Sequence, residues 1–181
     1  MANIGGKWGA WSELLAGLPY DVQSRLYYTL ANYQGVNPAS CYRLPLLAST
    51  QRQAIAPGGQ AVDAWRFTTL TAVYGISGTI ENETVGAGGI GVSDLTPVYG
   101  SEVGVQIDFN NGSTTFLGTA QEPFFLSSMG DKNHTTRMDP VIAVQNDQWN
   151  VTWNGNAALV NGVFSAITLH GVKIYAATGA I

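Results

Sequence analysis

The chain has 181 residues, of which 45% are hydrophobic and only 11% are charged, against about 25% charged in a typical soluble domain. This length supports one full-sized domain with its own core and excludes two large ones. A surface built from Asn, Thr, Ser, Gln and Gly is unlike that of a freely diffusing cytosolic enzyme. We therefore expect much of the surface to be covered by neighbouring molecules.

The few charges are unevenly placed, because residues 1–66 are slightly basic and residues 67–181 are acidic. The basic side chains of the first part are too dispersed to follow a phosphate backbone, which disfavours nucleic-acid binding. The single Cys41 excludes an intrachain disulfide and a cysteine zinc site, and we expect no metal or other cofactor. We expect no membrane span, since no apolar run reaches the roughly 18 residues that a span needs. We also expect no signal peptide, since the first residues lack the continuous apolar segment of a secretory signal.

The N-terminal part of the sequence predicts two helices. The first covers about residues 10–15 and ends at Gly17, and the second covers about residues 21–34. Pro19 precedes the second helix and Gly35 follows it, in the positions that proline and glycine favour at helix ends. Four apolar residues at helical spacing form one stripe on this helix, namely Val22, Leu26, Leu30 and Tyr33.

Residues 36–60 show neither helical nor strand periodicity, because Pro38, Pro45 and Pro57 interrupt them. The stretch is too apolar for a solvated linker, so we expect an extended arm that lies along another surface. Together with the helices it forms an N-terminal region, residues 1–64, that we expect to contact neighbouring subunits. The expected interface side chains are Trp8, Trp11, Leu26, Leu30, Tyr33, Tyr42, Leu46 and, from a later polar segment, Arg137.

From Trp65 onward the pattern changes to the alternation of apolar and polar residues that is typical of strands. The run 103–109, a turn at Asn110–Gly112 and the run 114–117 together predict a hairpin. Further strands are expected over residues 67–74, 76–82, 123–126, 140–145, 148–153 and 166–176. Strands without amphipathic helices between them predict an all-β fold, an antiparallel sandwich or barrel. Up-and-down barrels, immunoglobulin-like sandwiches and jelly rolls all fit this pattern, and we expect a single β-sandwich over residues 65–181. The long irregular connections favour the jelly-roll type.

The sequence contains no convincing catalytic motif. Residues 86–91 fit a dinucleotide-binding glycine pattern, but they run into further strands and not into a helix. His134 and His170 match no zinc spacing, and no nucleophile elbow accompanies them. Glu81 and Glu83 are better explained as exposed strand residues than as a glycosidase pair. We therefore predict a protein that is not an enzyme.

The tryptophans leave two functions open. Trp149, Val151 and Trp153 share one strand face, and packing between two sheets is the favoured interpretation of that face. Aromatic rings also stack on sugars, so a sugar-binding face that uses Trp149 and Trp153 is the alternative.

Three segments carry a resemblance to a known class of proteins. They are QEPF at residues 121–124, VIAVQNDQWNVTW at residues 141–153 and LHGVKIY at residues 169–175. In this order they resemble bacteriophage virion proteins with a jelly-roll domain. The resemblance implies a capsid, minor capsid, cement or decoration protein that is made in the host cytoplasm and assembles with copies of itself and other virion proteins. A lectin-like or receptor-binding β-sandwich, with a glycan as its partner, is the alternative.

Overall fold

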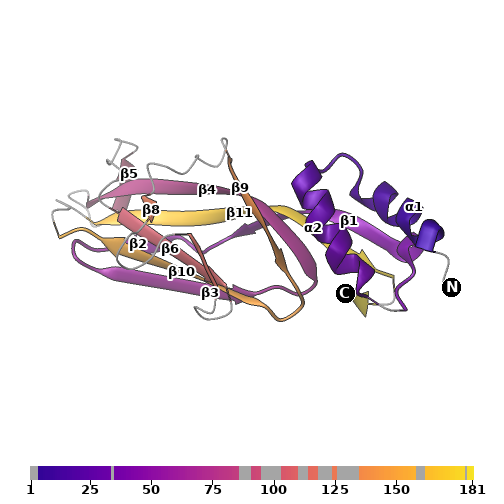
Figure 1. Cartoon of the computed structure of the whole chain (residues 1–181). Helices are drawn as coiled ribbons and strands as arrows, with labels where there is room; N and C mark the ends of the chain where they lie inside the picture. Colours follow the sequence, from indigo (N-terminus) through magenta and orange to yellow (C-terminus); the bar gives the residue numbers. More distant parts are fainter. Residues whose placement is uncertain are drawn as a thin grey trace.

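The computed structural model describes residues 4–33, 35–85, 91–94, 103–109, 114–117, 124–125, 135–157, 162–177 and 179–181. Figure 1 shows an elongated molecule in which two β-sheets face each other and two helices cover one end. The helical elements are α1 (Ile4–Leu15), α2 (Tyr20–Ala31) and a short 3-10 turn, η1 (Pro38–Ser40). Among the described residues, no helix has the length and apolar character needed to cross a membrane.

The strands form two sheets in which every pairing is antiparallel. The larger sheet contains β1 (Cys41–Ser49), β2 (Gln53–Ile55), β4 (Leu70–Val85), β5 (Gly91–Asp94), β9 (Thr136–Ala143), β11 (Val163–Ala176) and β12 (Gly179–Ala180). The smaller sheet contains β3 (Gln60–Arg66), β6 (Val103–Phe109), β7 (Thr114–Leu117), β8 (Phe124–Phe125) and β10 (Gln148–Gly155). The prediction of an antiparallel β-sandwich is confirmed.

Neighbouring strands in each sheet come from distant parts of the sequence. In the larger sheet β11 lies between β1 and β4, and β9 also pairs with β4. In the smaller sheet β10 lies between β3 and β6, and β6 also pairs with β7. The chain changes sheets from β3 to β4, from β9 to β10 and again from β10 to β11, so these connections tie the two sheets together.

The first hydrophobic core, which we call the sandwich core, lies between the two sheets. Trp149, Val151 and Trp153 of β10 point into it and are almost fully buried, which confirms their predicted packing role. The indole nitrogen of Trp153 donates a hydrogen bond of 3.1 Å to the Ser165 hydroxyl of β11, across the sandwich. The opposite sheet contributes, among others, Ile76, Ile167 and Leu169.

The second core, which we call the helix core, lies between the helices and the outer face of the larger sheet. Val172, Ile174 and Ala176 alternate along β11 and belong to the helix core, while Ile167 and Leu169 belong to the sandwich core. Because successive side chains of a strand point to opposite faces, β11 serves one core on each of its faces. The two helices and the turn between them cover the outer face of the sheet with apolar side chains: Trp11, Leu15, Leu18, Val22, Leu26 and Leu30.

Two arginines fasten the helices to the sheet. The guanidinium of Arg43 in β1 donates hydrogen bonds of 3.0 Å to the carbonyl oxygens of both Leu14 and Ala16, at the end of α1. The last carbonyls of a helix have no partner within it, so Arg43 satisfies two groups that would otherwise need water. Arg25 of α2 donates to the Pro140 carbonyl in β9 at 2.6 Å.

The segment expected to be an extended arm is part of the sheets. Residues 41–49 form β1 and pair along their whole length with β11, and residues 53–55 form β2 beside the other end of β11. The expected boundary between residues 64 and 65 falls inside β3. Local periodicity cannot report these pairings, because the partner strand lies more than a hundred residues away in the sequence.

The two strands expected over residues 67–74 and 76–82 are a single long strand, β4. An irregularity between Val73 and Gly75, where the pairing with β9 shifts, explains the break in the apolar pattern. The second predicted helix and its buried stripe are confirmed, since Val22, Leu26 and Leu30 are each at most 1% exposed. The predicted hairpin is present as β6 and β7, although its turn lies outside the described residues.

Candidate functional site

Four of the side chains expected at subunit interfaces are buried within the chain itself. Trp11, Leu26 and Leu30 belong to the helix core, and Leu46 belongs to the sandwich core. Their exposed fractions are at most 6%. The expectation that they contact a neighbouring subunit is therefore corrected. The outer face of the larger sheet covers Trp11, Leu26 and Leu30, and the packing between the two sheets covers Leu46.

The other expected interface residues differ in how accessible they are. Trp8 lies in α1, and its side chain is outside the described part of the structure. Tyr33 packs partly buried against the helix core, and burial together with the charge of Asp147 raises the pKa of its phenol. Tyr42 remains about half exposed, which leaves it available to a partner.

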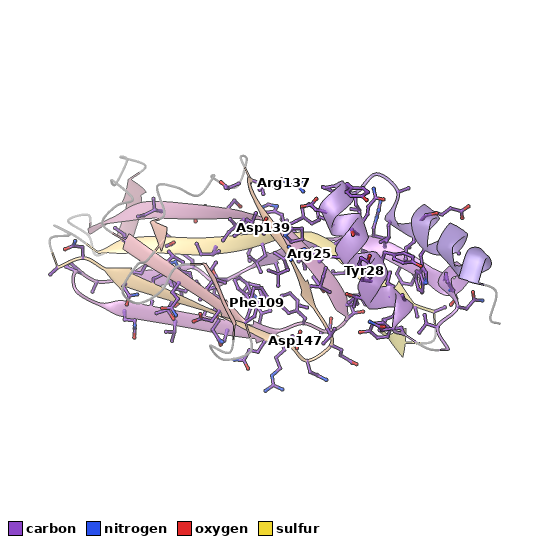
Figure 2. The ribbon with its side chains drawn as sticks, viewed as in Figure 1. Arg25, Tyr28, Phe109, Arg137, Asp139 and Asp147 are labelled. Carbon is purple, nitrogen blue, oxygen red and sulfur yellow. The ribbon has the colours of Figure 1, made fainter. Side chains whose placement is uncertain are left out.

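Arg137, which was expected to contact a partner, forms an ion pair with Asp21 of α2. The hydrogen bond from Arg137 holds the pKa of the Asp21 carboxyl below its usual value. In Figure 2 Arg137 lies near the start of β9, between that strand and α2. This arginine therefore helps to fix α2 to the sheet.

The edge of the larger sheet forms the first candidate contact surface. β1 ends the strand order on this side, and among the described residues it pairs with β11 alone. Three large apolar side chains of β1 are exposed: Tyr42 at 49%, Leu44 at 44% and Leu47 at 70%. An exposed apolar edge strand presents unpaired backbone groups to which another chain can add. We call Tyr42, Leu44 and Leu47 the β1 edge.

Tyr42 also has a defined orientation at this edge. Its ring stacks on that of Tyr175, its partner in β11, with ring centroids 5.5 Å apart and an angle of 14° between the planes. The stacked pair gives the β1 edge a rigid aromatic end. Rigid aromatic side chains are favoured at protein interfaces because little conformational freedom is lost on contact.

The outer side of α2 forms the second candidate surface. Tyr20 and Tyr28 are 86% and 71% exposed, the highest values among the large apolar side chains of the described residues. Tyr27 stands edge-on to Tyr28, with ring centroids 6.3 Å apart. We call Tyr20, Tyr27, Tyr28 and Tyr33 the tyrosine surface; Tyr28 is labelled in Figure 2.

The outer face of the smaller sheet is polar but carries little charge. Amide side chains on this face hydrogen-bond to one another, across strands from Gln60 of β3 to Asn154 of β10 at 3.0 Å and along β10 from Gln148 to Asn150 at 2.8 Å. Asp108 is buried on this sheet and accepts a hydrogen bond of 2.8 Å from Gln106. Val62 is 65% exposed beside them. This face can make neutral contacts with little loss of hydration energy.

The described residues offer little to support catalysis. His170 and Ser77 are hydrogen-bonded at 2.7 Å, but Ser77 is fully buried and cannot meet a substrate from solvent. Burial lowers the pKa of His170. Glu81 is engaged by Arg52 at 2.6 Å, and Arg52 in turn lies 3.9 Å over the Phe164 ring. Within the described part of the chain, no three His, Cys, Asp or Glu residues are grouped so that they could hold a metal ion.

Some of the candidate catalytic and ligand-binding residues lie outside the described part of the structure. They are His134, residues 86–90 of the glycine-rich stretch and the side chain of Glu83.

No protein-family model matches the chain, and no curated protein matches it significantly. The functional proposal therefore depends on strand topology and surface chemistry.

Proposed function

We propose that this protein is a non-enzymatic structural component of a virus particle, a jelly-roll subunit that acts by assembling with copies of itself and with other virion proteins. The observation that carries the proposal is the strand order. In one sheet β11 lies between β1 and β4, and β4 pairs with both β5 and β9; in the other sheet the order is β3-β10-β6-β7. Such non-sequential neighbours in two facing antiparallel sheets support a jelly roll, which combines two Greek keys. Virus capsid domains are among the proteins that use this architecture.

The surface chemistry supports an assembled state. With 8 basic and 12 acidic residues in 181, the chain has few charges that would lose their hydration when a neighbour covers them. Several of the charged side chains are engaged within the molecule, such as Arg43, Arg52 and Arg137. The amide-rich face of the smaller sheet adds a further neutral area.

The β1 edge supplies the apolar contact that assembly requires. Leu47 and Leu44 are exposed on an edge strand that, within the described residues, pairs with β11 alone, and the Tyr42 ring stacks on Tyr175. Such an edge buries a small area in each contact. In a closed symmetric shell the same contact recurs in every subunit, so weak contacts add up to a stable assembly.

Mass spectrometry of virus particles tests this function directly. Particles from the source of the sequence are purified on a density gradient, and their proteins are identified and quantified. We expect the chain to sediment with intact particles in many copies per particle. Its absence from purified particles, or its presence only in the soluble host fraction, would contradict the proposal.

A further inference from the structure

The tyrosine surface of α2 lines two adjoining hollows on the outside of the molecule. One has a volume of about 240 Å³ and lies between α1 and α2, with Ser12, Tyr20, Gln23 and Tyr27 among its lining residues. The other has a volume of about 390 Å³ and lies at the end of α2, lined by Tyr28, Thr29, Asn32 and Tyr33. Tyr28 lines both hollows, so the two form a track along the helix that passes this ring.

The exposed rings on this track have no structural task that explains their exposure. Tyr20 and Tyr28 are 86% and 71% exposed, whereas the opposite side of the same helix buries Val22, Leu26 and Leu30 completely. The fold therefore needs the buried stripe and does not need the two tyrosines. Exposed rings of this kind offer flat apolar faces with a hydroxyl at the tip, and such faces stack on the C–H face of a sugar ring.

The charge of the track indicates which ligand it suits. The described residues that line the two hollows include no charged side chain. A neutral ligand matches this environment, because a charged one would lose its hydration without gaining an ion pair. Burial raises the pKa of the Tyr27 phenol, so this lining group is uncharged as well.

The polar groups at the rim are held in place and offer oxygen acceptors. The Gln23 amide nitrogen donates to the Leu18 carbonyl at 2.7 Å, and the Asn32 amide nitrogen donates to the Tyr28 carbonyl at 3.2 Å. The Thr29 hydroxyl donates to the Arg25 carbonyl at 3.0 Å. The Thr29 hydroxyl thus keeps its oxygen as an acceptor, while Gln23 and Asn32 each keep a carbonyl oxygen and a second amide hydrogen, so the rim offers both acceptors and donors. A sugar hydroxyl both donates and accepts and can use either kind of group, whereas a proline-rich segment has few N–H groups to donate to the acceptor oxygens.

We propose that this track is a binding site for a neutral oligosaccharide, with Tyr20 and Tyr28 as the stacking platforms. The site differs from the sugar-binding face considered in the sequence, because Trp149 and Trp153 are fully buried. It also uses a surface apart from the β1 edge. A subunit can therefore hold a glycan on α2 whether or not its edge strand is in contact with a neighbour.

A binding experiment with defined probes tests the site. The full chain is titrated by calorimetry with maltohexaose, cellohexaose, chitotetraose and a galactose oligomer, and separately with decaproline. We expect at least one neutral saccharide to bind, and Tyr28→Ala to weaken that binding about tenfold, the loss that follows when a stacking contact of about 1.4 kcal/mol is removed. Tyr28→Phe should retain most of the affinity, because it keeps the ring.

Tyr42→Ala is the matched control, since it removes an exposed tyrosine on a different element. Its saccharide affinity should equal that of the wild type. The proposal is overturned if none of the saccharides binds, if the Tyr20→Ala/Tyr28→Ala double variant binds as well as the wild type, or if decaproline alone binds at these residues. The mass of the double variant in solution reports on assembly independently, so failure of the glycan site and failure of the virion role are distinguishable.

Discussion

The indole nitrogen of Trp153 and the hydroxyl of Ser165 form a buried hydrogen bond of 3.1 Å that joins the two sheets across the sandwich core. We predict that Trp153→Phe lowers the free energy of unfolding by about 1–3 kcal/mol, because it leaves the Ser165 hydroxyl buried without its donor. Urea denaturation measures the change. The double variant Trp153→Phe/Ser165→Ala should lose less than the sum of the two single variants, and strict additivity would show that the bond contributes nothing.

Gly171 of β11 is expected to tolerate no side chain. A Cβ at this position would overlap the backbone carbonyl oxygen of Ala72 in the neighbouring β4, and backbone cannot move aside cheaply. We predict that Gly171→Ala yields little folded protein by circular dichroism. Gly75→Ala is the comparison, because its Cβ would lie 2.5 Å from the Thr135 methyl group, which belongs to an exposed side chain that can shift. Equal loss of structure in the two variants would contradict the packing described here.

Two residues on opposite sides of α2 separate packing from surface roles. Leu26 is fully buried in the helix core, so Leu26→Ala should lower the free energy of unfolding by about 2–5 kcal/mol. Tyr28 on the same helix is mostly exposed, and Tyr28→Ala should change the free energy of unfolding by about 0.5 kcal/mol or less. Thermal and urea unfolding of both variants check this. A small effect of Leu26→Ala would show that α2 is not packed against the sheet.

The ion pair between Arg137 and Asp21 predicts a pH dependence of stability. The hydrogen bond from Arg137 lowers the folded-state pKa of Asp21 below the value of 3.8 that it has in the unfolded chain. The stability that this ion pair contributes to the folded state is therefore fully present above pH 3.8 and is lost as the pH falls through the lower, folded-state pKa of Asp21. Asp21→Asn should flatten this part of the curve of melting temperature against pH. A curve parallel to that of the wild type would show that the pair is not formed.

The sequence predicted those elements whose patterns are local. The apolar stripe of α2 and the alternation around Trp149 and Trp153 indicated their burial correctly, because a helix or strand buries one face at a fixed period. Residues 41–49 could not be placed in this way. Their pairing with β11 depends on a partner far away in the sequence, and Pro45 hides the strand pattern although an edge strand accepts proline.

The candidate surfaces were less predictable than the core. Apolar periodicity identifies side chains that are buried, but it does not say whether the covering surface belongs to the same chain. Leu26 and Leu30 were therefore expected at an interface and are found in the helix core. Tyr20 and Tyr28 were not singled out, although their positions outside the apolar stripe of α2 are a signal that could have revealed them as exposed aromatics.

The absolute mass of the purified full chain by light scattering, measured over a range of concentrations, tests the central claim of assembly most directly. We predict an oligomer whose mass rises with concentration, and a lower mass for Leu47→Lys, because that change places a charge on the 70% exposed side chain of the β1 edge. Tyr20→Ala, which alters an exposed residue away from this edge, should keep the mass of the wild type. A wild-type protein that stays a monomer at every concentration would contradict assembly through the β1 edge.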